Sequence, residues 1–90
     1  MKAVRTASAF RKDAKRIARR GYPLDKLEAT IDSLRAGTAL ATSLRPHPLK
    51  GEWQNYWECH NAPDWLLIYR VTEDEVLLAR TGTHADMFEK

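Results

Sequence analysis

Apolar residues recur with a helical period in the first part of the chain and with strand-like patterns in the last part. The first stripe has the spacing of one helix face, between the possible N-cap Ser8 and the helix-stopping Gly21. We therefore expect a helix here, with a short strand before it at residues 2–6. The apolar stripe consists of Phe10, Ala14, Ile17 and Ala18.

A second helix is predicted to start near Pro23 or Asp25 and to end at Gly37. The turn between the two helices is short, so we expect an antiparallel helical hairpin. The second apolar stripe consists of Leu24, Leu27, Ile31 and Leu34.

Beyond Gly37 the pattern changes. Residues 38–51 contain Pro46, Pro48 and Gly51, which predicts a loop with room for a helical turn. Three strands are then predicted in sequence, joined by short connections that favour an antiparallel meander. The strands are expected at residues 53–59, 65–71 and 76–81, and residues 82–88 are expected to form a loop or a brief terminal helix.

The order strand, two helices, three strands predicts an α+β fold with the helices on one face of a mainly antiparallel sheet. The other face then remains available for a site. Ninety residues suffice for one domain, which we expect to span residues 1–90.

Charge is distributed unevenly, although the net charge is only +3. A basic first helix is either a solvated face or a footprint for phosphates or an acidic partner. No apolar run approaches the roughly 20 residues that span a bilayer, and the first residues lack a secretory signal, so we expect a cytoplasmic protein. Residues 1–20 carry +7, from Lys2, Arg5, Arg11, Lys12, Lys15, Arg16, Arg19 and Arg20 against Asp13, and residues 21–90 carry −4.

Three histidines lie in polar motifs outside the predicted helices. His47 is in Arg-Pro-His-Pro-Leu-Lys-Gly, His60 in Glu-Cys-His-Asn-Ala-Pro-Asp-Trp, and His84 in Arg-Thr-Gly-Thr-His. Histidine gives and takes protons near neutral pH, so three of them in a basic protein suggest acid–base work on a polyanion.

Two of these motifs contain candidate carboxylate partners. Asp64 follows His60 across a proline turn and could orient its ring; alternatively, it makes turn hydrogen bonds. Strand alternation predicts that Glu58 and His60 share one face and that Cys59 faces the other. That alternation, and the absence of paired Cys or His spacings, argues against a zinc site.

Arg80 precedes His84, and a guanidinium suits phosphate oxygens, but a surface arginine paired with a carboxylate is equally consistent with the sequence. Phe88 either covers the core or stacks on a base. We expect the aromatic residues Trp53, Tyr56 and Trp57 to pack in the core and on the sheet.

Together, the motifs His-Pro-Leu-Lys-Gly, Glu-Cys-His-x-x-Pro-Asp-Trp-Leu-Leu-Ile-Tyr and Arg-Thr-Gly-Thr-His resemble the YafQ branch of the RelE-like bacterial toxins, over essentially the whole chain. The resemblance implies a RelE-like fold and a toxin that cuts mRNA codons in the ribosomal A site without a metal. It implies catalytic roles for His47, His60, Asp64 and His84, and phosphate or RNA contacts for Arg80, Phe88, Glu58 and Lys50. Glu58 stands where the YafQ toxin has an aspartate.

The chemistry implied is attack of the RNA 2′-hydroxyl on the adjacent phosphate, with a base and an acid each contributing about 10²–10⁴-fold. Two of the three histidines would form the acid–base pair and the third would contact phosphate, with Asp64 setting a histidine's tautomer. An acidic antitoxin is the expected protein partner. The alternatives are a binding-only protein of the same fold and a metal-dependent hydrolase. Docking on ribosomal RNA is assigned to Arg11, Lys12, Lys15, Arg16, Arg19 and Arg20.

Overall fold

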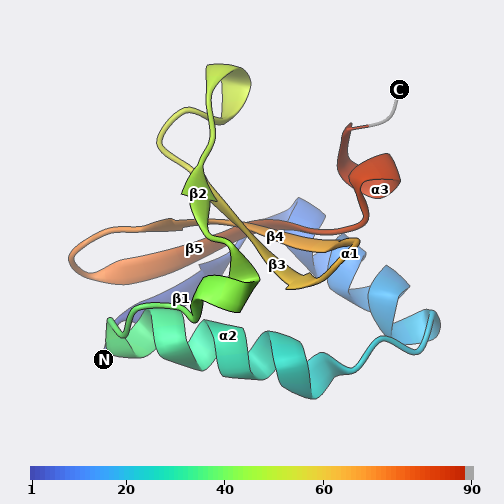
Figure 1. Cartoon of the computed structure of the whole chain (residues 1–90), viewed down its shortest axis with the longest axis horizontal. Helices are drawn as coiled ribbons and strands as arrows, with labels where there is room; N and C mark the ends of the chain where they lie inside the picture. Colours follow the sequence, from blue (N-terminus) through green and yellow to red (C-terminus); the bar gives the residue numbers. More distant parts are fainter. Residues whose placement is uncertain (89–90) are drawn as a thin grey trace.

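The protein is described from a computed structural model that covers residues 1–88, of which Phe88 contributes only its backbone. The predicted stacking or core role of the Phe88 side chain therefore lies outside the described residues. Apart from the short elements η1, β2 and η2, the helices and strands follow the order predicted from the sequence (Figure 1). The elements are β1 (Ala3–Thr6), α1 (Ser8–Arg19), α2 (Leu24–Ala36), η1 (Thr42–Leu44), β2 (His47–Pro48), η2 (Gly51–Trp53), β3 (Trp57–Ala62), β4 (Trp65–Val71), β5 (Glu75–Gly82) and α3 (His84–Phe88).

The five strands form one sheet in the order β1-β5-β4-β3-β2. Strands β3, β4 and β5 are an antiparallel meander, as predicted, and β1 adds to the edge of β5 in parallel. The prediction of an α+β fold with a mainly antiparallel sheet is confirmed.

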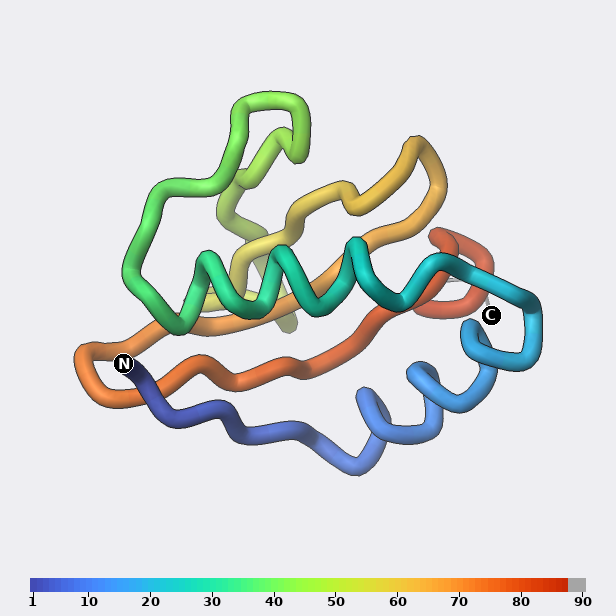
Figure 2. Tube along the Cα trace, turned by 90° about the horizontal axis from the view of Figure 1, so that it is seen from below, coloured from blue at the N-terminus to red at the C-terminus, as the bar shows by residue number. Residues whose placement is uncertain are grey.

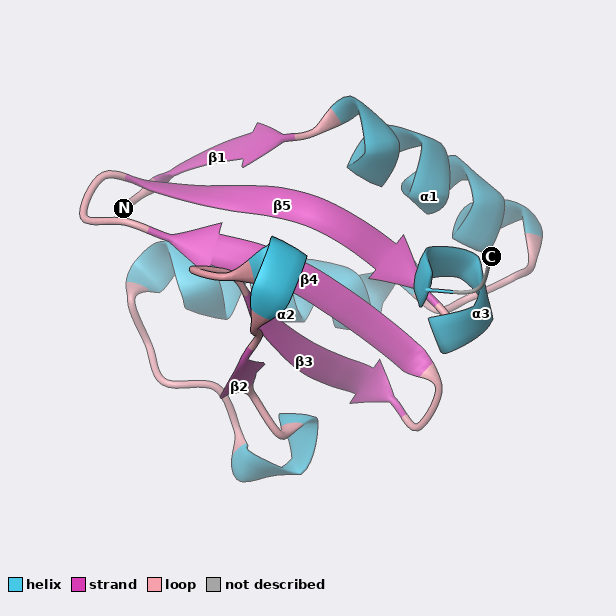
Figure 3. Cartoon of the chain, turned by 90° about the horizontal axis from the view of Figure 1, so that it is seen from above, coloured by secondary structure: helices cyan, strands magenta, loops and turns pink. Residues whose placement is uncertain are grey.

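The helices are placed on different sides of the sheet. Helix α2 runs beneath the sheet, whereas α3 and the short helix η2, which follows the edge strand β2, lie on the opposite side (Figure 1). Helix α1 continues from β1 along the edge beside β5 (Figure 3) and contacts that strand. Seen from below, α1 and α2 run in roughly opposite directions (Figure 2), as the short turn between them predicted.

The core lies between α1, α2 and the lower face of the sheet. Burial of apolar area, at roughly 25 cal/mol per Å², is the main stabilising contribution here. Two residues of the predicted stripes, Ala18 and Leu24, are exposed instead, because they lie at helix ends. Burial raises the pKa of the Cys59 thiol to about 12, so this cysteine is unreactive. The core residues are Phe10, Ile17, Leu27, Leu34, Cys59, Trp65, Leu67, Tyr69, Val76 and Leu78.

The beginning of α1 differs from the prediction in one respect. Ala7 is the N-cap, without a side-chain cap, and Ser8 is the first helical residue. Arg11 instead ties the junction together, because its Nη1 donates to the Thr6 carbonyl at 2.7 Å. Gly37 ends α2 with φ 73°, the left-handed conformation that favours glycine, as predicted.

The strand predicted at residues 53–59 is shifted: β3 occupies Trp57–Ala62. Asn55 has φ 77°, which interrupts an extended chain, so the residues before Trp57 form the loop of a β2–β3 hairpin. The two-residue strand β2 lies in the segment predicted as a loop. Trp57 is 43% exposed, so its predicted core position is wrong.

Within residues 1–88, no helix combines the length and apolar character needed to cross a membrane.

Candidate active site

Strand register brings His47, Glu58 and His60 to the face of the sheet opposite α2. His47 on β2 pairs with Glu58 on β3, and His60 follows two residues later on the same side. Cys59 between them belongs to the core below. The predicted alternation is therefore confirmed, and β2 adds His47 to it.

The His47 ring is held between two oxygen atoms. Its Nε2 lies 3.1 Å from Oε1 of Glu58, and its Nδ1 lies 3.4 Å from the Pro48 carbonyl oxygen. Glu58 is only 7% exposed in its side chain. It therefore supports His47 from below, and its negative charge opposes the direct phosphate contact expected from the sequence.

His60 is the second ring of this pair. The His47 and His60 ring centroids are 6.0 Å apart, with the planes tilted by 33°. Burial first, and then the charge of Arg45, lower the pKa of His60 below its ordinary value of 6.5. Its Nδ1 is buried and has no hydrogen-bond partner among the described residues. His60 is thus a neutral imidazole at pH 7, ready to accept a proton.

Asp64 contacts His84, not His60 as the sequence suggested. Its Oδ1 lies 3.4 Å from Nδ1 of His84 and 3.4 Å from the His84 backbone nitrogen. The reason is topological: the β3–β4 turn that carries Asp64 lies beside the end of β5, where α3 begins. The carboxylate therefore orients the third histidine.

Arg80 is already paired with a carboxylate. Its Nε donates to Oδ2 of Asp13 at 2.6 Å, and its Nη2 donates to Oδ1 at 3.2 Å. Asp13 is buried in the middle of α1 and also accepts from the Thr81 backbone nitrogen at 3.1 Å. Arg80 thus holds α1 to β5, and its pairing with a carboxylate matches the alternative that the sequence left open.

The first helix presents two kinds of basic residue. Arg16 and Arg20 face α3, where both approach Asp86. At 100° per residue, the remaining basic positions lie on the outward side of the helix. Of the predicted docking residues, Arg11, Arg16 and Arg20 make internal contacts, whereas Lys12, Lys15 and Arg19 are exposed on the outward side of the helix. Lys50 is exposed in the connection between β2 and η2.

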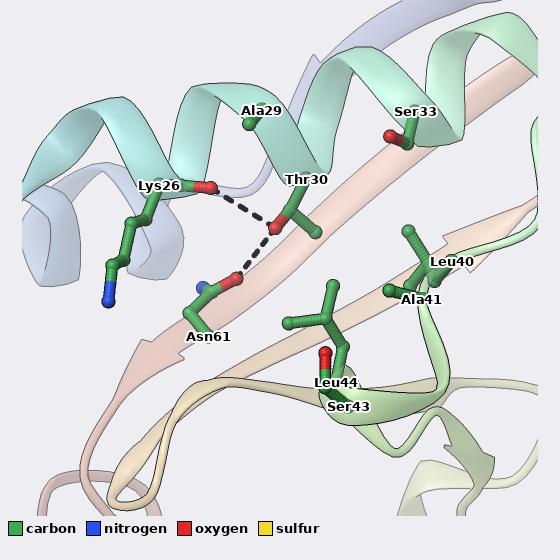
Figure 4. A pocket seen from close by; sticks show the side chains of 9 residues that line it. All are labelled: Lys26, Ala29, Thr30, Ser33, Leu40, Ala41, Ser43, Leu44 and Asn61. Carbon is green, nitrogen blue, oxygen red and sulfur yellow. Dashed lines mark hydrogen bonds between the residues drawn. The ribbon is translucent and has the colours of Figure 1, made fainter.

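A recess borders the site on the side of α2. This recess, of about 360 Å³, is lined by the residues labelled in Figure 4. There Thr30 Oγ1 lies 2.8 Å from Oδ1 of Asn61 and 3.1 Å from the Lys26 carbonyl. A neighbouring pocket, of about 290 Å³, shares Lys26 and Asn61 with the first and is also lined by Arg45 and His60. His60 therefore lies beside a recess with two cationic side chains at its margin.

Sequence reasoning missed Asp13 and Asp86. The partner of Asp13 is 67 residues away in the chain, so no local pattern revealed it. Asp86 did have a local signal, because Thr83-x-x-Asp86 has the spacing of a helix capping box. Among the described residues, no group of three or more His, Cys, Asp or Glu side chains is arranged to hold a metal ion.

Comparison with known proteins gives a consistent result. A family model described as "Bacterial toxin of type II toxin-antitoxin system, YafQ" matches residues 2–89. The mRNA interferase toxin YafQ of Escherichia coli strain K12 is 38% identical over 80 residues, covering 88% of this chain and 87% of that protein.

Two solved structures extend the likeness to the fold. A copper-bound mutant toxin from Helicobacter pylori matches with a TM-score of 0.92 and 34% identity, over 98% of this chain and 100% of that one. A chain of the E. coli DinJ–YafQ toxin–antitoxin complex matches with a TM-score of 0.89 and 33% identity, over 97% of each chain.

Proposed function

The chain belongs to the YafQ family of type II toxin–antitoxin toxins, and we propose that it is an endoribonuclease that cuts mRNA codons in the ribosomal A site. The observation that carries the proposal is the placement of His47 and His60 with ring centroids 6.0 Å apart on the sheet face opposite α2. The Asp64–His84 pair lies at the ends of the neighbouring strands. The site thus offers three imidazoles to one stretch of RNA.

The reaction needs only proton transfer and charge stabilisation from the protein. A base removes the proton of the 2′-hydroxyl, and the oxygen attacks the adjacent phosphorus. The bond to the 5′-oxygen breaks, an acid protonates that oxygen, and a 2′,3′-cyclic phosphate remains. Base and acid each contribute about 10²–10⁴-fold, and positive side chains stabilise the charge on the pentacoordinate phosphorus.

His60 suits the base, because its lowered pKa keeps the ring neutral at physiological pH. His47, oriented by Glu58 through Nε2, suits contact with the phosphate, because its ring lies beside that of His60 and its Nδ1 makes only a long contact of 3.4 Å to the Pro48 carbonyl. His84 then suits the acid, with Asp64 orienting its ring through Nδ1. This division of labour accounts for all three histidines and both carboxylates.

The register supports a shared substrate. His60 on β3 lies opposite Leu66 on β4, which lies opposite Gly82 on β5. Two strand spacings separate the Cα atoms of His60 and Gly82 by about 10 Å, and His84 follows two residues later. A short stretch of RNA laid across the strands would therefore contact both histidines. Lys26 and Arg45, at the margin of the recess beside His60, would take the neighbouring phosphates.

The charge distribution of the protein suits binding to the ribosome. The outward stripe of Lys12, Lys15 and Arg19 would dock on ribosomal RNA, which is dense in phosphates. Because the substrate is translated mRNA, the protein would act in the cytoplasm, as one toxin domain spanning residues 1–90. By analogy with the E. coli relative solved with DinJ, a cognate antitoxin would bind and silence it.

The test is cleavage of a defined mRNA by purified protein, with and without ribosomes stalled with a known codon in the A site. We expect cuts in that codon only when ribosomes are present, products ending in a cyclic phosphate, and unchanged rates in excess EDTA. Ribosome binding with intact mRNA would instead support the binding-only alternative. Loss of cleavage in EDTA would support a metal-dependent hydrolase.

A further inference from the structure

We propose that Asp86 is a positioning residue that fixes α3, and with it His84, against the basic helix α1. The inference rests on the proposed function, in which His84 acts on the substrate. It adds an element that the histidine motifs do not contain: a carboxylate that faces α1 and stands two residues after His84 in the same short helix.

The contact between Asp86 and α1 is bidentate. Arg20 donates from Nη1 to Oδ2 at 2.7 Å and from Nη2 to Oδ1 at 3.1 Å. Arg16 Nη1 lies 3.7 Å from the same Oδ1. A single exposed ion pair contributes little, but a bidentate arginine pair fixes geometry as well as charge. The Asp86 side chain is only 12% exposed. The hydrogen bond from Arg20 lowers the pKa of Asp86 far below its ordinary value, so the carboxylate stays charged.

Asp86 also caps the N-terminus of α3. The Thr83 backbone nitrogen donates to Oδ2 of Asp86 at 3.0 Å, and the Asp86 backbone nitrogen donates to the Thr83 hydroxyl at 3.1 Å. This reciprocal pair is a capping box, in which two otherwise unpaired helix donors find acceptors. One carboxylate therefore serves both the helix start and the contact with α1.

The backbone conformation of Gly82, and its lack of a side chain, permit this arrangement. Its φ is 141°, a conformation that side-chain-bearing residues rarely adopt. A Cβ at this position would lie 2.9 Å from Oδ2 of Asp86 and 3.2 Å from its Cβ. The backbone of β5 thus passes close under the carboxylate, and a larger residue at position 82 would displace it.

The consequence for His84 follows from the size of α3. A helix of five residues is not stable by itself, so its position depends on the contacts that tether it. Asp86 is tied to α1 by Arg20 and to β5 through Arg80, whose Nη2 donates to the Asp86 carbonyl at 3.4 Å. Without the carboxylate, the His84 ring would lose its fixed place relative to the substrate.

The experiment compares Asp86→Ala, Asp86→Asn and Arg20→Ala with the matched controls Asp32→Ala and Arg70→Ala, which remove exposed charges elsewhere. A misplaced catalytic group lowers kcat on the order of 10–100-fold. We expect this loss in all three variants with KM within about twofold of wild type, since the docking stripe is untouched. The controls should match wild type. Unchanged kcat in the Asp86 variants would overturn the inference. So would a faster reaction, which would mean that Asp86 only shields the arginines.

A second measurement does not depend on activity. The Met87 backbone nitrogen donates to the Thr83 carbonyl at 3.3 Å, a bond at the start of α3 that does not involve the Asp86 side chain. In Asp86→Ala we expect the Met87 amide to exchange with solvent roughly tenfold faster or more, while core amides of β4 keep their protection. Unchanged Met87 exchange would overturn the inference. If the wild type cuts no mRNA, the proposed function fails, and the exchange result alone then decides whether Asp86 holds α3.

Discussion

The Nε atom of Arg80 donates to the Asp13 carboxylate at 2.6 Å, and the Asp13 side chain is only 1% exposed. Asp13 also accepts from the Thr81 backbone nitrogen, on the part of β5 that lies beyond its pairing with β1. At this point of β5, the buried Asp13 carboxylate of α1 accepts the backbone hydrogen bond that a neighbouring strand would otherwise accept. The charge of Arg80 is matched before any phosphate arrives, so its first role is to join α1 to the sheet.

Removing this carboxylate should destabilise the fold. Breaking a buried ion pair by deleting one partner costs about 3–5 kcal/mol, because the other charge is left uncompensated. We predict a loss of this size for Asp13→Ala in urea-induced unfolding. Asp32→Ala, an exposed carboxylate on α2, should change stability by no more than about 0.5 kcal/mol. A change below about 1 kcal/mol in Asp13→Ala would show that the pair is not structural.

Glu58 should matter to catalysis more than to stability. In Glu58→Gln the shape and one acceptor oxygen remain, but the negative charge beneath His47 is lost. We predict cleavage that is about 10-fold slower or more, because the carboxylate that orients the His47 ring through Nε2 is replaced by a neutral amide. Unfolding by urea should keep its wild-type midpoint or move to higher denaturant. A variant that cuts as fast as wild type would remove Glu58 from the site.

His60 should give the stability of the protein a defined pH dependence. Its pKa in the folded state is below 6.5, so between that lowered pKa and about 6.5 the unfolded chain binds more protons. Stability therefore rises with pH through this window and falls as the pH decreases below 6.5. In His60→Gln this contribution should disappear from urea midpoints measured between about pH 5 and 7, the range in which histidine titrates. An identical slope in wild type and variant would contradict the assignment.

The outward stripe of α1 should determine the salt dependence of ribosome binding. Each phosphate contact contributes about 0.7–0.9 to the slope of log affinity against log salt. We predict that the triple change Lys12→Gln, Lys15→Gln and Arg19→Gln lowers this slope by about two. Arg70→Gln, on the far end of β4, should leave it as in wild type. A slope that is unaltered in the triple variant would place the docking surface elsewhere.

Local patterns predicted most of the fold, because the apolar periods of α2, β4 and β5 depend only on near neighbours. Strand alternation likewise placed Glu58 and His60 on one face and Cys59 on the other. The exceptions are an element too short to show a period and contacts between residues that are distant in the chain. Strand β2 has two residues, one of them proline, so it carries no period.

The remaining differences concern the partners of charged residues. Asp64 lies four residues from His60 in the chain, but it contacts His84, which is 20 residues away. Which carboxylate meets which cation is decided by how turns and strand ends are stacked, and a single sequence does not encode that in any local spacing. The three histidines were therefore identifiable from sequence, whereas the contacts of Asp13 and Asp64, and the contact of Asp86 with Arg20, required the structure.

The most direct test of the central claim is primer extension on mRNA from cells that express the chain, compared with the double variant His60→Ala/His84→Ala. The account predicts in-frame cuts within codons for the wild type, together with growth arrest. It predicts neither in the double variant, produced at the same level and folded by circular dichroism. Equal cutting by the two proteins would contradict the account, because the proposed base and acid would then be dispensable.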